Sequence, residues 1–138
     1  MREIKFRAWS DGVEISPDYI DRNGVAHWEE NSIPTSTKEI EQYTGLKDKN
    51  GVDIYEGDFL ESVRKVYGGK IKTERFVVKF GHYNTCSDDY YGQSAYGFYA
   101  HQLYRMFETT IDIGTIFNDD GISVCGNVHE NPELLENK

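Results

Sequence analysis

Polar and apolar side chains alternate along the first residues of the chain, and this period of two predicts a β-strand from Ile4 to Trp9. An Asn-Gly pair at residues 23–24 is a turn signal, and residues 25–28 after it predict a short hairpin. The alternation divides the first strand between two faces, one with Ile4, Phe6 and Ala8 and the other with Lys5, Arg7 and Trp9.

Two longer strands are predicted in the middle of the chain, over residues 58–67 and 71–80. A Gly-Gly pair separates them, which is typical of a tight hairpin. The period is broken near Arg64 and Lys65, and a β-bulge there would explain the break. Further strands are predicted over residues 97–103, 111–117 and 122–128, with a turn at 118–121.

Residues 29–42 allow two interpretations. Ser36 followed by Glu39 is the pattern of a helix capping box. The alternation of polar and apolar residues from Ile40 onward indicates a strand instead. We favour extended structure, because the segment leads directly into turn-rich sequence.

The end of the chain carries helix signals. Asn131 is a good cap, Pro132 suits the first helical position, and Glu133 favours the positive end of the helix dipole. A short helix is therefore predicted over 132–136, with its two leucines docked on the sheet.

The segment from Tyr43 to Leu60 contains two bends and the start of a strand. Lys49-Asn50-Gly51 is a strong turn signal, because Asn and Gly adopt positive φ at little cost. At the second bend we expect Gly57 to take a positive φ and Asp58 to accept a hydrogen bond from a neighbouring N–H. A ligand loop is the alternative there. Turns spaced this closely predict a small barrel.

Composition narrows the class of protein. The 138 residues match one domain, and an aromatic content of 14% argues against disorder. No apolar run approaches the roughly 20 residues of a membrane helix, and the N-terminus lacks the apolar core of a signal peptide. We therefore expect a cytoplasmic protein whose two cysteines, Cys86 and Cys125, are reduced thiols.

The net charge of −9 is distributed unevenly. Residues 1–42 carry −4, residues 43–80 carry +2, and residues 81–138 carry −7. The overall field does not attract nucleic acid, so only a local patch could bind it. Such a patch is predicted on the central hairpin, where Tyr67 could stack on a base; the alternative is a solvated hairpin whose lysines prevent edge pairing. Its basic residues are Arg64, Lys65, Lys70, Lys72 and Arg75.

A tyrosine-rich stretch lies in residues 81–96, which read as a long surface loop. Tyrosine is enriched in protein interfaces, so this loop is a candidate partner-binding surface. A loop that packs its own rings over the barrel end is the alternative, and the sequence leaves both open. The candidate binding residues are Tyr83, Tyr90, Tyr91 and Tyr96.

Two Cys/His pairs have spacings that could supply a zinc site, His82 with Cys86 and Cys125 with His129. A buried thiol at Cys125 and a surface His129 explain the second pair equally well, and we predict no metal and no cofactor. The sequence contains no Gly-rich phosphate loop, no His-Glu-x-x-His and no Gly-x-Ser-x-Gly. We therefore expect a protein that is not an enzyme.

Three blocks of the sequence, residues 1–9, 42–58 and 126–135, resemble the YopX family of bacteriophage and prophage proteins. The resemblance implies an SH3-type β-barrel encoded on mobile elements, and it brings no catalytic residues. Residues 10–41 and 81–97 depart from the family pattern, so a role specific to this chain is expected there.

The combined expectation is a mainly β protein with an SH3-like β-barrel and a short C-terminal helix. Residues 1–42 would form an N-terminal strand and hairpin extension, packed with residues 43–138 into one compact unit. The expected function is a phage or prophage accessory protein that binds a macromolecule, with a protein partner preferred and nucleic acid as the alternative. Open strand edges would also permit a homo-oligomer.

Overall fold

The computed structural model describes residues 3–84, 94–103, 110–112 and 121–135, and regular structure in this part is nearly all β. The mainly β fold is therefore confirmed. One short 3₁₀ helix, η1 (Pro132–Leu135), lies near the end of the chain. The strands are β1 (Phe6–Ser10), β2 (Val13–Ile15), β3 (Tyr19–Ile20), β4 (Ala26–Glu30), β5 (Ile33–Thr37), β6 (Ile40–Lys47), β7 (Asp53–Tyr55), β8 (Asp58–Lys65), β9 (Ile71–Asn84), β10 (Ser94–Gln102), β11 (Thr110–Asp112) and β12 (Ile122–Asn127).

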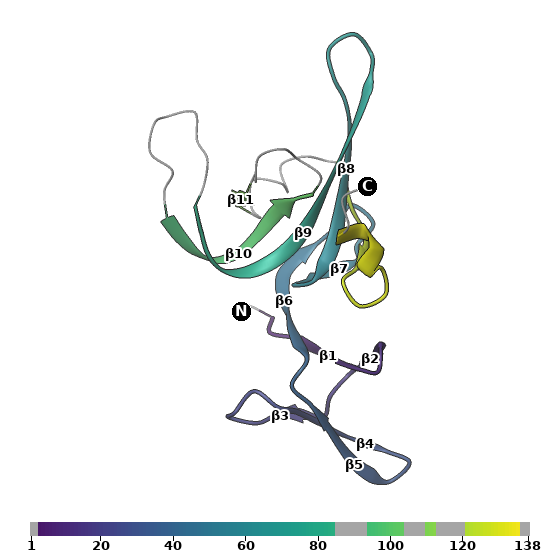
Figure 1. Cartoon of the computed structure of the whole chain (residues 1–138), viewed down its shortest axis with the longest axis vertical. Helices are drawn as coiled ribbons and strands as arrows, with labels where there is room; N and C mark the ends of the chain where they lie inside the picture. Colours follow the sequence, from purple (N-terminus) through teal and green to yellow (C-terminus); the bar gives the residue numbers. More distant parts are fainter. Residues whose placement is uncertain (1–2, 85–93, 104–109, 113–120, 136–138) are drawn as a thin grey trace.

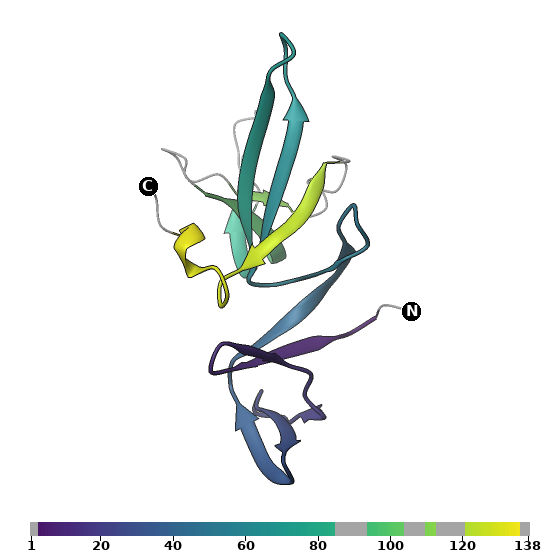
Figure 2. The ribbon, with the colours of Figure 1, turned by 90° about the vertical axis from the view of Figure 1, so that its right-hand side faces the viewer.

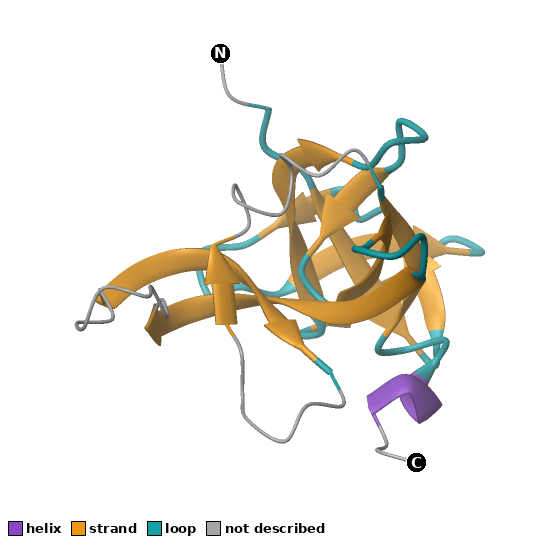
Figure 3. Cartoon of the chain, turned by 90° about the horizontal axis from the view of Figure 1, so that it is seen from above, coloured by secondary structure: helices purple, strands orange, loops and turns teal. Residues whose placement is uncertain are grey.

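The strands form three antiparallel sheets (Figure 1). Their orders are β2-β1-β6-β7, β11-β10-β9-β8-β12 and β3-β4-β5. The three-stranded sheet lies at one end of the long axis and the five-stranded sheet at the other, with the four-stranded sheet between them (Figure 2). Seen from above, the five-stranded sheet curls into a half-barrel (Figure 3).

The main core lies inside this curl, because the sheet has an apolar face to cover. Ile54 from β7 packs there, so the four-stranded sheet contributes to the same core. Strand β6 makes the connection: its first residues pair with β1 and its later ones with β7. It crosses the predicted boundary at residue 42, and the division into two parts stays a prediction. The buried cluster is Ile54, Leu60, Phe76, Val78, Ala100 and Ile122.

The N-terminal strand is confirmed, but its buried face differs from a simple apolar rule. Ala8 and Trp9 are buried, and so is Arg7 at 7% exposure. Ile4 and Phe6 are 66% and 37% exposed. Arg7 and Trp9 tolerate burial because each finds a carboxylate partner from another strand.

The predicted hairpins form where the glycines permit them. Gly24 turns the chain between β3 and β4 with φ of 78°. The central hairpin pairs β8 with β9 in an unbroken register through Arg64↔Lys72 and Lys65↔Ile71, so the bulge predicted there is wrong. Gly68 and Gly69, both with positive φ, lie in the turn, and the N–H of Val66 donates to the C=O of Lys70, so the strands stay in register up to the turn. A register shift occurs instead in β12, between Val124 and Gly126.

Extended structure over residues 29–42 is confirmed, as β5 and the start of β6, and the capping-box helix is wrong. Pairing of β5 with β4 satisfies the backbone groups that a helix would have used. The C-terminal helix is confirmed as η1, although Leu135 remains 50% exposed and docks only in part. In the described part of the chain, no helix has the length and apolar character needed to cross a membrane.

The predicted surface loop over 81–96 is wrong in its extent. Strand β9 continues to Asn84 and β10 begins at Ser94, with Gly81 opposite Gly97 in the ladder. The polar, Gly-containing composition of this segment did not indicate the end of β9 or the start of β10. Cross-strand pairing depends on a partner strand, which local composition does not reveal. The strand over 97–103 is confirmed with this earlier start, and of the strand over 111–117 only residues 111–112 are described, within β11.

Candidate binding groove

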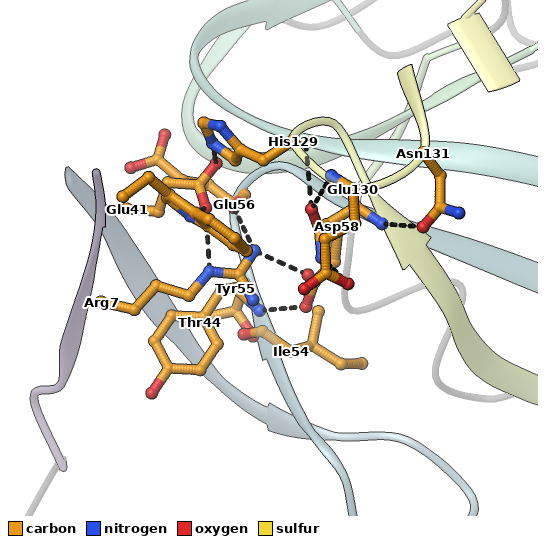
Figure 4. Close-up of polar contacts among 12 residues, drawn as sticks. Arg7, Glu41, Thr44, Ile54, Tyr55, Glu56, Asp58, His129, Glu130 and Asn131 are labelled. Atoms are coloured by element: carbon orange, nitrogen blue, oxygen red, sulfur yellow. Dashed lines mark hydrogen bonds and ion pairs between the residues drawn. The ribbon is translucent and has the colours of Figure 1, made fainter. Parts of the chain in front are cut away.

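Arg7 is buried between two carboxylates from distant parts of the chain (Figure 4). Its Nε donates to Glu41 Oε1 at 2.8 Å, and its Nη2 donates to Asp58 Oδ1 at 2.7 Å. Glu41 and Asp58 are 8% and 2% exposed. Because Arg7 lies on β1, Glu41 on β6 and Asp58 on β8, one guanidinium joins the four-stranded sheet to the five-stranded sheet.

Glu41 is held by three different side chains. Besides Arg7, the indole Nε1 of Trp9 donates to Glu41 Oε1 at 2.6 Å, and His129 Nε2 lies 3.3 Å from Oε2. The rings of Trp9 and His129 stack with centroids 4.3 Å apart and an interplanar angle of 17°. The turn after β12 is thereby attached to the N-terminal strand β1, so an early and a late segment of the chain meet at this carboxylate.

The bend before β8 is shaped by the same network. The N–H of Tyr55 donates to Asp58 Oδ2 at 2.9 Å, the local hydrogen bond that the sequence predicts. Gly57 has φ of 85°, and a Cβ there would collide with the carboxylate of Glu41. Glycine is therefore required at residue 57 both by the backbone angle and by the close approach of Glu41. In the same bend, the Arg7 guanidinium lies 4.7 Å from the centre of the Tyr55 ring.

Negative charge exceeds positive charge in this cluster. Arg7 is surrounded by the carboxyl groups of Glu41, Asp58 and Glu56, three acids around one cation. Burial raises the pKa of Asp58 to about 6, and the attraction of Arg7 offsets this only in part. Burial also raises the pKa of Glu56, whose Oε1 accepts the N–H of Gln42 at 3.1 Å.

An open groove of about 410 Å³ begins at this cluster. Glu41, Glu56 and Gly57 line it together with residues of β9, and Gly57 is bonded to β9 directly through the C=O of Val78. Four consecutive β9 residues contribute, which places the groove along the edge of the strand as well as its faces. The other lining residues are Val77, Val78, Lys79, Phe80, Tyr99, Val128 and Leu135.

Among the described residues, no strand covers the edge of β9 beside the groove. Pairing with β8 ends at Val77, opposite Phe59, and the C=O of Val78 then accepts the N–H of Gly57 at 2.8 Å. Backbone groups of alternate strand residues point the same way, so those of Phe80 face the same edge as those of Val78. Within the described ranges, no backbone group beyond the β9–β10 ladder bonds to Phe80. In the part of the chain that the structure describes, the groove therefore borders a backbone donor and acceptor of Phe80 that lack a strand partner.

Of the four candidate tyrosines, the structure describes two, and both lie on strands. Tyr83 on β9 is buried at 8% exposure and stacks on Tyr99 with centroids 4.9 Å apart. Tyr96 on β10 is 73% exposed and meets the ring of Phe80 edge-on at 5.4 Å. Tyr90 and Tyr91 lie outside the described residues. Of these two tyrosines, Tyr96 has the accessible ring, and its contact with Phe80 places it next to the groove.

The candidate basic residues lie on the β8–β9 hairpin, which projects from the body of the protein (Figure 1). Tyr67 near its tip is completely exposed, and Lys65 and Lys70 are exposed as well. Lys72 forms an ion pair with Glu74 at 2.8 Å, and Arg75 pairs with Glu61 at 3.0 Å. Arg64 is opposite Lys72 in the register. Acidic neighbours thus neutralise part of the patch.

The four candidate zinc ligands are not assembled in the part of the chain that is described, and Cys86 lies outside it. No group of three or more His, Cys, Asp or Glu side chains suited to a metal occurs among the described residues. Cys125 is exposed, so the expected buried thiol is wrong. His129 is not a simple surface residue, because its ring stacks on Trp9.

Sequence reasoning did not identify the network or the groove, although a signal existed. Arg7 and Trp9 belong to the block 1–9, Asp58 ends the block 42–58, and His129 lies in the block 126–135. The three blocks singled out in the sequence meet in space at the ion pair of Arg7 and Glu41: Asp58 bonds to Arg7, and His129 contacts Glu41. The presence of all three blocks in one chain was the signal in the sequence that they share a structural role.

Comparisons with known proteins agree with the earlier resemblance. A family model described as YopX protein matches residues 5–136. Among solved structures, the crystal structure of protein EF1440 from Enterococcus faecalis is 28% identical over 99% of this chain and 100% of that chain, with a TM-score of 0.49. No curated protein matches the chain.

Proposed function

This chain belongs to the YopX family, and we propose that it is a phage- or prophage-encoded accessory protein that binds a protein partner without catalysing a reaction. The proposal places it in the cytoplasm of a bacterial host. The groove along the free edge of β9 is the surface through which it would bind.

One observation carries the proposal: accessible aromatic side chains border a groove that has an unpaired backbone edge. Phe80 and Tyr96 are 46% and 73% exposed, and their rings contact each other. Aromatic rings and free strand edges are both common elements of protein recognition. The proposal therefore retains the predicted tyrosine-rich binding surface, but now centres it on Tyr96, which lies on a strand instead of in a loop.

Two carboxylates of the buried network, Glu41 and Asp58, support a non-catalytic role. Both oxygens of Glu41 and both oxygens of Asp58 have partners within the fold. A general base needs a lone pair directed at substrate, and these two groups direct theirs at Arg7, His129 and the Tyr55 N–H. Their hydrogen bonds and ion pairs instead hold the junction between the sheets together.

Affinity capture from a bacterial host lysate, with matched variants, tests this function. The groove variant combines Phe80→Ser with Tyr96→Ser, and the control is Ile33→Ser, which alters a similarly exposed apolar residue on β5. We expect a partner that the wild type and the control recover and the groove variant does not. Equal recovery by all three proteins would contradict the proposal.

Nucleic-acid binding is the second candidate function, and the projecting hairpin is the observation that favours it. Lys65, Lys70 and Tyr67 are exposed on a hairpin that extends away from the body. A filter-binding titration at low salt tests it, with Lys70→Glu plus Lys72→Glu as the variant. Affinity that falls with salt and with the variant would support this function. Absence of binding by the wild type at low salt would dismiss it.

A further inference from the structure

We propose that the β9 edge and its groove bind an extended, lysine- or arginine-containing segment of the partner protein, which pairs with β9 as an added strand. This inference rests on the proposed function and specifies the chemistry of the occupant. Three features of the groove lead to it.

The first feature is the backbone of β9. Val78 uses its C=O to hold Gly57, and the next residue that faces the same edge is Phe80. An extended peptide placed there would continue the line of β8 beyond its first residue, Asp58. The added segment would exchange main-chain hydrogen bonds with Phe80, as in strand addition to other sheets. A helix or a nucleic acid could not supply this ladder.

The second feature is the surplus of negative charge at one end of the groove. Glu41 and Glu56 both line it, and Arg7 on the buried side is already shared with Asp58. A carboxylate that is partly removed from water without a full counter-charge attracts a cation. Lys79 also lines the groove, but in the described structure it forms no ion pair. A cationic side chain of the occupant would lie near Glu56, away from Lys79.

The third feature is the apolar wall. Phe80 and Leu135 are each about half exposed and line the same groove. Side chains of a strand alternate between its two faces, so one face of an added segment could cover these residues while the other reaches Glu56. The occupant thus alternates apolar and cationic residues. A second copy of this chain fits less well, since each copy carries a net charge of −9.

The direct probe is a fluorescent peptide of about eight residues that alternates lysine and valine, titrated against the folded protein by polarisation. A glutamate–valine peptide of the same length tests the charge requirement. Two further lysine–valine peptides carry N-methyl groups on the lysine amides or on the valine amides, so their charge is unchanged. In one of them the methyl groups face β9 and block pairing.

We expect the lysine–valine peptide to bind, and one of its two methylated forms to lose at least about tenfold in affinity. Glu56→Gln should weaken binding about three- to tenfold, because it removes the charge and keeps the shape. The matched control, Glu30→Gln on β4, removes an exposed charge remote from the groove and should bind as the wild type does. Melting curves of both variants check that each remains folded.

Equal binding of the glutamate–valine peptide, or equal binding of both methylated peptides, would overturn the inference. A dimer in sedimentation analysis that Phe80→Ser converts to a monomer would assign the edge to a second copy and also overturn it. If lysate capture depends on the groove while the lysine–valine peptide fails to bind, this inference is wrong and the proposed function stands. Loss of groove-dependent capture would instead remove the function on which it rests.

Discussion

At the scale of single residues, the junction between the sheets depends on how Arg7 is compensated. Two buried carboxylates and the ring of Tyr55 surround its guanidinium. Such an arrangement is costly to form but even more costly to break, because removal of one partner leaves charges buried without a counter-ion. Arg7 is thus expected to matter for stability out of proportion to its size.

Arg7→Ala should lower the free energy of unfolding by about 3–5 kcal/mol, since Glu41 and Asp58 would remain buried without their cation. Urea denaturation monitored by circular dichroism measures the change. Lys72→Ala removes a cation from a more exposed ion pair with Glu74 and is the matched control, with an expected loss of at most about 1 kcal/mol. Similar losses for the two variants would show that the buried network is not a major source of stability.

Asp58 predicts a pH dependence of stability. Its pKa rises from 3.8 in the unfolded chain to about 6 in the fold, so the folded state binds more protons between these values. Stability contributed by this group is therefore present at acid pH and is lost as the pH rises from 3.8 to about 6. The stability of the wild type relative to Asp58→Asn should fall over this interval and level off above it. Denaturation series of both proteins across that range measure the difference, and a relative stability that increases with pH would contradict the assignment.

At the scale of elements, turn chemistry was readable from the sequence because it is local. Asn-Gly and Gly-Gly pairs predicted three bends that the structure contains, at Gly24, Gly51 and Gly68. The lengths of β9 and β10 were not readable, because residues 81–84 and 94–96 become strand only through their mutual pairing. Gly57 shows both sides of this contrast: its bend was predicted, and its contact with Glu41 was not.

Gly57→Ala and Gly24→Ala separate these two effects. Both glycines have φ near 80°, so each substitution carries the backbone cost of about 1–2 kcal/mol. At Gly24 a Cβ meets nothing within 4 Å, whereas at Gly57 it collides with Glu41. Thermal denaturation should therefore show a larger loss for Gly57→Ala. Equal losses would mean that Glu41 moves aside without cost.

At the scale of the whole molecule, three small sheets are joined by polar contacts as well as by a core. Arg7, Glu41 and His129 connect the N-terminal strands to the five-stranded sheet and to the turn before η1. Thr37 adds a bond from β5 to β1, where its Oγ1 donates to the C=O of Trp9 at 3.0 Å. These connections predict that the sheets unfold together.

We expect one cooperative unfolding transition. Trp9 and Trp28 lie in the four-stranded and three-stranded sheets, so tryptophan fluorescence reports on these sheets, while far-UV circular dichroism reports on all strands. The midpoints from the two probes in urea should coincide, as in two-state unfolding. Separate midpoints would indicate that the N-terminal sheets unfold independently.

The sequence by itself determined the strand-rich character, most turns and the short final helix, because these depend on alternation, glycine and capping within a few residues. Only the tertiary structure decided that Arg7, Glu41, Asp58 and His129 meet, and that no described strand pairs with the edge of β9 beside them. Those features depend on which distant strands become neighbours, and no local pattern encodes the distance between residues 7, 41, 58 and 129. Because these charged residues are buried, they pair with one another and form the junction beside the groove.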